Sequence, residues 1–120
     1  MSILGKGAFG AVFKVEEGGQ TSAVKKILNH NPSALREMDL LKKVDHENII
    51  KYHQSYQEGA HLCIVMEFVD QGTLTSLVAE EDNDPNSIIF TEWNTWRTLR
   101  SLSSALSYLH SLQPNPILHR

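Results

Sequence analysis

The 120-residue sequence has little cysteine, no long hydrophobic run and no excess of basic charge. Its single cysteine, Cys63, cannot form an intramolecular disulfide, so we expect an intracellular, cytoplasmic setting. Apolar stretches such as Leu62–Met66 fall far short of the roughly 20 residues of a membrane span, and Met1 is not followed by a basic and then apolar leader. Lys and Arg number 11 against 14 Asp and Glu, which argues against nucleic acid as a partner, because a polyanion needs a basic surface.

Hydrophobic residues make up 41% and charged residues 21% of the chain, as is typical of a soluble globular protein. Alternating apolar residues predict strands over 11–16 and 22–28, separated by a glycine turn. Pro32, with Asn or Ser beside it as a cap, predicts a helix that runs to Val44. The other expected elements are strands over 49–56 and 62–69, the latter buried on both faces, a helix over 72–79, an acidic loop over 80–86, and a helix over 92–112 that ends before Pro114 and Pro116. Short turns between strands predict an antiparallel sheet.

Three glycines, Gly5, Gly7 and Gly10, precede the first alternating strand and suggest a loop that approaches phosphate groups. A dinucleotide-binding fingerprint would need Gly10 to open a helix, whereas a strand follows it, which argues against a Rossmann-type dehydrogenase. A Walker loop would need Lys and Ser or Thr after Gly10, but Ala11 and Val12 follow. The remaining interpretations are a lid over a nucleotide and a plain hairpin tip, and Val12, apolar on the polar face of its strand, favours the lid.

The expected helix over 32–44 carries Glu37 in line with Leu40, Leu41 and Val44, so a carboxylate lies on its core-facing stripe. Because an inward carboxylate without a partner is costly, a cation from elsewhere in the chain is implied. The alternative is that Glu37 flanks the stripe and reaches water. Lys25 and Lys26 are the natural partners, and alternation leaves both open. The six histidines show no spacing typical of a metal site, so no metal is expected to be bound by them.

Taken together, the motifs of this chain resemble those of the eukaryotic-type protein kinase family, and most of all its serine/threonine and NimA-related members. The resemblance implies an α+β fold: a kinase N-lobe over 1–67, with a five-stranded antiparallel sheet and helix C, then the hinge and first C-lobe helices over 68–120. The segments that carry it are Gly5–Val12, Ala23–Lys25, Arg36–Glu37, His46–Ile49, Ile64–Phe68, Tyr108–His110 and Ile117–Arg120. Glu47 departs from the family pattern, which has proline at that position.

The resemblance also implies roles for individual residues. Lys25, rather than Lys26, would hold the ATP phosphates and be oriented by Glu37, while the three glycines would cover them. His119 and Arg120 would open the catalytic loop. Contacts to adenine and its surroundings would come from Leu4, Val12, Ala23, the gatekeeper Met66, and the backbones of Glu67 and Val69. Leu41, Tyr52 and His119 would form part of an internal spine.

The family's catalytic Asp and magnesium ligands are expected after Arg120. We therefore expect the 120 residues to bind ATP without transferring phosphate, and Mg²⁺ to act only in a full-length domain that phosphorylates Ser or Thr of protein substrates. The alternative is a non-catalytic nucleotide-binding or interaction module. The apolar face of the helix over 92–112 is expected to stay exposed in the absence of further C-lobe residues.

Overall fold

The computed structural model describes residues 1–7, 10–28, 31–83 and 92–112, except the side chains of residues 78 and 80–83. The chain forms two compact units, Met1–Phe68 and Val69–Arg120, so their boundary lies one residue after the expected one. The elements are β1 (Ser2–Gly7), β2 (Gly10–Glu17), β3 (Gln20–Leu28), α1 (Pro32–Lys43), β4 (Tyr52–Glu58), β5 (His61–Glu67), α2 (Leu74–Asn83) and α3 (Glu92–Ser111).

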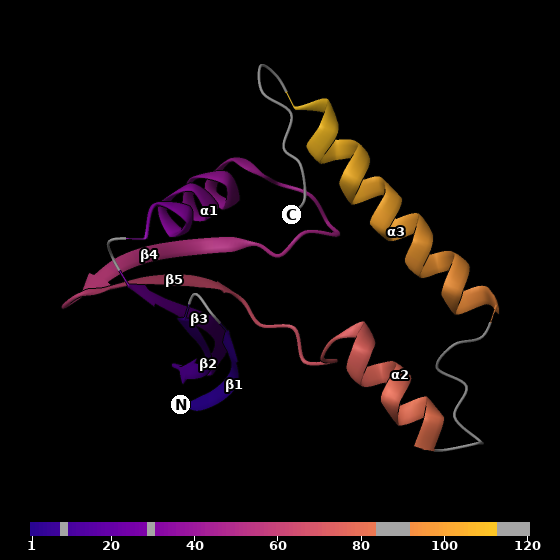
Figure 1. Ribbon diagram of the computed structural model, residues 1–120, viewed down its shortest axis with the longest axis horizontal. Coiled ribbons are helices and arrows are strands. Elements are labelled where there is room, and N and C mark those ends of the chain that lie inside the picture. The colour runs from indigo at the N-terminus through magenta and orange to yellow at the C-terminus, as the bar shows by residue number, and fades with distance from the viewer. Residues whose placement is uncertain (8–9, 29–30, 84–91, 113–120) are drawn as a thin grey trace. The chain divides into compact units, whose positions relative to one another are not determined.

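All five strands belong to one antiparallel sheet in the order β1-β2-β3-β5-β4, and α1 lies over one face of it (Figure 1). The predicted fold class, a five-stranded antiparallel sheet with a helix, is therefore confirmed. The β2–β3 hairpin turns at Gly18 and Gly19, which both have positive φ, as tight hairpin turns require. This hairpin sets the register of β3 against β2, with Phe13 opposite Val24.

Strand β5, which lies between β3 and β4 in the sheet, is buried on both faces from Leu62 to Met66, as its continuous apolar run predicts. On the α1 face, Ile64 is fully buried among side chains of the sheet and of α1. On the opposite face, Cys63 is fully buried in a smaller cluster with Val24 and Val65. Adjacent residues of a strand therefore belong to two separate hydrophobic clusters, one on each side of the sheet.

Helix α1 begins where its capping residues predict. The Asn31 side chain accepts a hydrogen bond from the Ser33 backbone N–H at 3.0 Å, and Pro32 occupies the first turn, where a missing N–H costs nothing. Lys42 and Lys43 lie in the last turn, where positive charge favours the helix dipole.

Strand β4 starts at Tyr52, three residues later than predicted from Ile49. The reason is a turn: the Ile49 N–H donates to the His46 carbonyl at 3.1 Å, and the Asn48 N–H donates to His46 Nδ1 at 3.0 Å. These local bonds use backbone groups that a strand would need for its ladder.

Helix α2 runs from Leu74 to Asn83, whereas a helix over 72–79 and a loop over 80–86 were expected. Thr73 and Ser76 cap its N-terminus reciprocally, because the Ser76 N–H donates to Thr73 Oγ1 and the Thr73 N–H donates to Ser76 Oγ. The prediction was wrong for residues 80–83, which belong to the helix. Residues 84–86 lie outside the described part of the chain.

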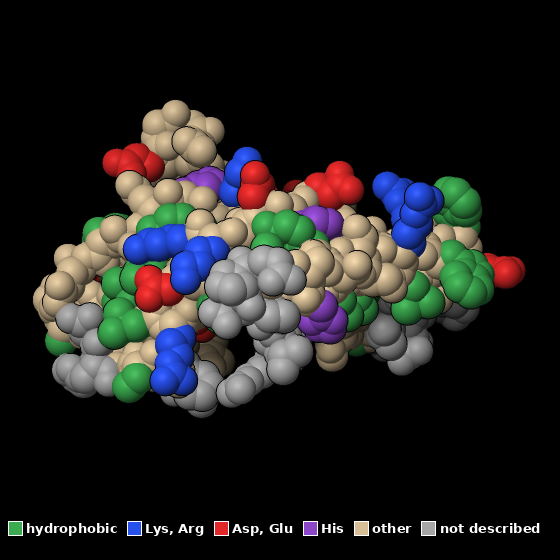
Figure 2. Space-filling view, turned by 90° about the horizontal axis from the view of Figure 1, so that it is seen from above, with side chains coloured by type: hydrophobic (Ala, Val, Ile, Leu, Met, Phe, Trp, Pro, Cys, Tyr) green, Lys and Arg blue, Asp and Glu red, His purple; other side chains and the backbone are tan. Residues whose placement is uncertain are grey.

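Helix α3 was correctly predicted, and its apolar face is largely uncovered. Trp96 is 65% exposed and Leu102 is 52% exposed, and hydrophobic side chains are visible on the surface in Figure 2. Pro114 and Pro116, expected to end this helix, lie outside the described residues. Over the residues that the structure describes, no helix is both long and apolar enough to cross a bilayer.

Candidate functional site

Lys25 and Glu37 form an ion pair between β3 and α1. Lys25 Nζ donates to Glu37 Oε1 at 2.7 Å, across 12 positions of sequence. The side chains are 23% and 44% exposed, respectively. The expected pairing of Glu37 with a lysine of this strand is therefore present, but its carboxylate is half-exposed rather than fully buried.

The partial exposure of Glu37 follows from how α1 is rotated on the sheet. Ala34, Met38 and Leu41 contact the main cluster, whereas Leu40 is 40% exposed. The prediction that Glu37 and Leu40 lie on the core-facing stripe of α1 was thus wrong. The helix is rotated by part of a turn, and Glu37 lies beside the residues that contact the core. From that flank its carboxylate reaches Lys25 while part of it remains in contact with water.

The register of β3 explains which of the two neighbouring lysines meets Glu37. Lys25 lies opposite Val12 on β2 and Ile64 on β5, so it shares the α1 face of the sheet with them. Lys26 lies opposite Cys63 and points to the other face. Alternation alone left both lysines open, and the structure places Lys25 against Glu37.

Three of the residues expected around adenine lie on the same face as Lys25. Ala23 and Met66 are opposite each other in the ladder and are 7% and 9% exposed, and Val12 packs against the cluster that contains them. Leu4 lies at an irregularity in the β1–β2 pairing and is 48% exposed. Leu41 and Tyr52, expected in the internal spine, contact the same cluster.

The three glycines of the segment Gly5–Gly10 differ in what the fold demands of them. Gly10 has a φ of +144°, and a Cβ built on it would lie 2.1 Å from the Lys26 carbonyl oxygen. Gly5 and Gly7 have no positive φ, and a Cβ on either would meet nothing within 4 Å among described residues. The fold explains glycine at position 10 alone, so it leaves room for another explanation at positions 5 and 7.

The remaining expected residues are at the end of β5 and beyond it. The Glu67 N–H donates to the Lys51 carbonyl at 2.9 Å, and Glu67 Oε1 accepts from the Lys51 N–H at 2.9 Å. This side-chain role of Glu67 was not foreseen from sequence. Val69 begins the second unit and is 55% exposed. His119 and Arg120 lie outside the described residues.

A second group of polar residues, on the opposite face of the sheet, was not predicted. Lys26 Nζ donates to Glu58 Oε2, and the Cys63 thiol lies 4.0 Å from the same oxygen. The hydrogen bond from Lys26 lowers the pKa of Glu58, and the same contact raises the pKa of Lys26. Burial, followed by the neighbouring Cys63, raises the pKa of the Tyr56 phenol. No sequence signal marks Glu58 as the partner, because 32 positions separate it from Lys26.

Comparison with known proteins places these features in a family. The model of the protein kinase domain matches residues 1–120. Cell division control protein 7 of Schizosaccharomyces pombe is 38% identical over 98% of this chain and 11% of its own length. The probable serine/threonine-protein kinase nek2 of Dictyostelium discoideum is 32% identical over 100% of this chain and 31% of its own length.

The fold agrees with this assignment. A crystal structure of Rad53 residues 1–466 in complex with AMP-PNP superposes with a TM-score of 0.75 and 31% sequence identity, and the match covers 92% of this chain and 29% of that one. The chain thus spans less than a third of the length of each of these three proteins. Because the model of the protein kinase domain matches all 120 residues and the sheet of the kinase N-lobe is present, this chain belongs to the protein kinase family and forms part of a protein kinase domain.

Proposed function

We propose that the first unit binds ATP on the α1 face of its sheet, as part of a kinase domain that phosphorylates Ser or Thr residues of proteins. The Lys25–Glu37 pair is the observation that carries this proposal. An ammonium group has three N–H donors, and one of them is held by Glu37 at 2.7 Å. The other two remain for phosphate oxygens, and the lysine is 23% exposed, so a ligand has access to it.

In this proposal Glu37 acts by orientation. A free lysine loses the entropy of its long side chain when it binds phosphate, whereas an ion pair to a helix fixes that side chain beforehand. Val12, Ala23 and Met66 supply an apolar surface on the same face for the adenine ring, and the resemblance adds Leu4 of β1 to it.

The glycines at positions 5 and 7 support the same interpretation. Since neither packing nor a positive φ requires glycine there, the absence of side chains is explained by close approach of a ligand to the backbone N–H groups. Bound Mg²⁺ would shield the phosphate charge during transfer. Within these residues the chain's own contribution is to bind and orient the nucleotide.

The proposal predicts that ATP raises the thermal midpoint of the chain and that Lys25→Met removes most of this rise. Ligand at a hundredfold excess over Kd stabilises a folded protein by about 2.7 kcal/mol, which a thermal scan detects readily. Lys26→Met is the matched control, because it makes the same change one residue away on the opposite face. Each variant is compared with itself without ATP, so a change in basal stability does not enter the result. Equal loss of the ATP shift in both variants, or no shift in the parent chain, would contradict the proposal.

A further inference from the structure

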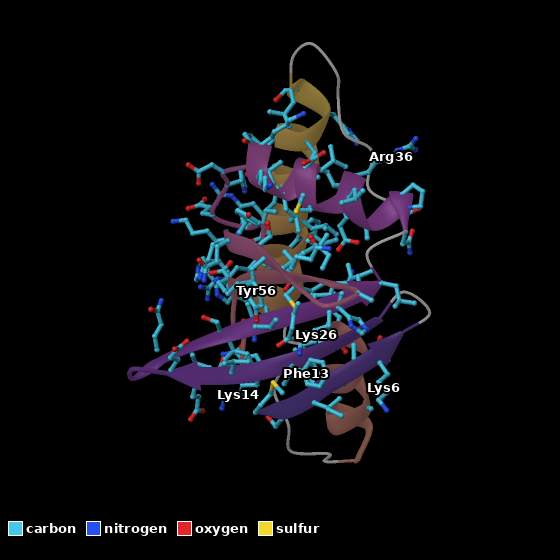
Figure 3. All side chains as sticks on the ribbon, turned by 90° about the vertical axis from the view of Figure 1, so that its left-hand side faces the viewer. Lys6, Phe13, Lys14, Lys26, Arg36 and Tyr56 are labelled. Carbon is cyan, nitrogen blue, oxygen red and sulfur yellow. The ribbon has the colours of Figure 1, made fainter. Side chains whose placement is uncertain are left out.

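The first unit carries an open groove of about 700 Å³ on the sheet face that bears Lys26, away from the Lys25–Glu37 pair. The end of β1, the start of β2, the end of β3 and the start of α1 form its walls, and His61 of β5 completes it. Figure 3 shows Phe13 and Lys26 side by side on neighbouring strands, with Lys6 on the outer strand. No side chain that lines this groove takes part in the proposed binding of ATP.

The described side chains that line the groove include two lysines, of which one is already paired with a carboxylate. Among the described residues that line it, Lys6, Lys26 and His61 are ionisable, and none is Asp or Glu. Glu58 already neutralises Lys26 from outside the groove. Lys6 makes no ion pair with any residue in the described part of the chain and is exposed. An anionic group entering the groove therefore finds Lys6 available to pair with it.

The floor of the groove is apolar rather than polar. Phe13 lies with its ring centroid 5.9 Å from Lys26 Nζ, so a cation stacks against the aromatic ring. Leu28 is 53% exposed at the end of β3, and Pro32 adds a further apolar wall. An isolated phosphate or a nucleic-acid backbone would leave this apolar surface in contact with water.

We propose that this groove is a docking site for a partner protein, recognised through a peptide segment in which an aromatic side chain is flanked by carboxylates. The aromatic side chain would cover Phe13 and Leu28, and a flanking carboxylate would pair with Lys6. Charge complementarity carries the choice of partner: among the described lining residues, Lys6 is the lysine without a carboxylate partner, and a positive charge beside an apolar floor favours acidic over basic segments. Gly7 and Gly10 also line the groove, so an occupant contacts the glycine segment from the side opposite the proposed nucleotide.

The test is fluorescence anisotropy with the 120-residue chain and a short fluorescein-labelled peptide that has one phenylalanine between pairs of glutamates. We expect saturable binding, with Lys6→Glu and Leu28→Ser each weakening it about tenfold, the scale of one lost contact. Lys43→Glu and Leu102→Ser are the matched controls, because both positions lie outside the groove and Leu102 is 52% exposed against 53% for Leu28. Peptides with lysine for glutamate, or serine for phenylalanine, should bind at least about tenfold more weakly.

Several results would overturn the proposal. They are equal binding of the acidic and lysine peptides, competition by inorganic phosphate or a short single-stranded DNA as strong as by the peptide, and equal effects of the groove and control variants. Dimerisation of the chain that Lys6→Glu abolishes would assign the groove to a second copy instead. Lys25→Met should leave peptide binding unchanged, so failure of the ATP proposal and failure of this one are distinguishable. Circular dichroism of each variant identifies any that does not fold, and Leu28→Ser and Lys6→Glu test the groove independently.

Discussion

Replacing Gly10 with alanine tests whether the fold itself requires glycine at this position. The added Cβ would lie 2.1 Å from the Lys26 carbonyl oxygen and 3.1 Å from the Lys26 carbonyl carbon. Both atoms belong to the backbone of β3, so no side chain can rotate to relieve the contact. The φ of +144° adds a conformation that L-residues rarely adopt.

From these two effects we expect Gly10→Ala to lower the free energy of unfolding of the first unit by about 2–4 kcal/mol. A domain of this size loses roughly 4–8 °C in thermal midpoint for each kcal/mol, so the midpoint should fall by about 8–32 °C. Circular dichroism during heating measures this directly. The main cause is steric, since β2 and β3 would have to separate locally to admit the methyl group.

Two other glycines separate the steric effect from the backbone effect. Gly59 has a φ of +59° and open space around its Cβ position, so Gly59→Ala should cost only about 1–2 kcal/mol. Gly7 has neither constraint, and Gly7→Ala should change stability by less than about 1 kcal/mol in either direction. In the proposed function, Gly7 lacks a side chain so that a nucleotide can approach its backbone. Gly7→Ala should therefore reduce the ATP-dependent rise in thermal midpoint even though it leaves stability nearly unchanged. A Gly10→Ala midpoint equal to that of Gly7→Ala would refute the steric reasoning.

Two further predictions concern the core and the second ion pair. Ile64 is fully buried, so Ile64→Ala should lower the free energy of unfolding by about 3 kcal/mol in urea titrations. Ile50 is 43% exposed, so the control Ile50→Ala should cost less than about 1 kcal/mol. Equal costs would contradict the assignment of the core. Because Lys26 lowers the pKa of Glu58 in the folded state, their pair stabilises the fold above about pH 4.5 and this contribution is lost as the pH falls through the lowered pKa. The thermal midpoint of the parent chain should therefore exceed that of Glu58→Gln at neutral pH, and the difference should shrink below about pH 4.5; a difference independent of pH would show that the pair contributes no charge-dependent stability.

Features that depend on local chemistry were predictable from the sequence. The start of α1 follows from Asn31 and Pro32, and the burial of β5 follows from its unbroken apolar run. Features that depend on how distant segments align were not. The start of β4 was predicted too early because the sequence does not show that the turn hydrogen bonds at His46 replace strand pairing. The rotation of α1 was predicted wrongly because Leu40 and Met38 are both apolar, so either could face the core.

The same limit applies to the candidate site, where a single register decides the chemistry. Lys25 and Lys26 are identical in type and adjacent in sequence, yet one contacts Glu37 on α1 and the other contacts Glu58 on β4. A slip of β3 by one residue would exchange their faces and would turn Val24 toward α1. The glycine turn at Gly18 and Gly19 opposes such a slip, as does the burial of Ile27 on one face and of Val24 on the other. The hydrophobic residues of β3 thus determine which lysine meets Glu37 on the α1 face and which one lines the groove on the opposite face.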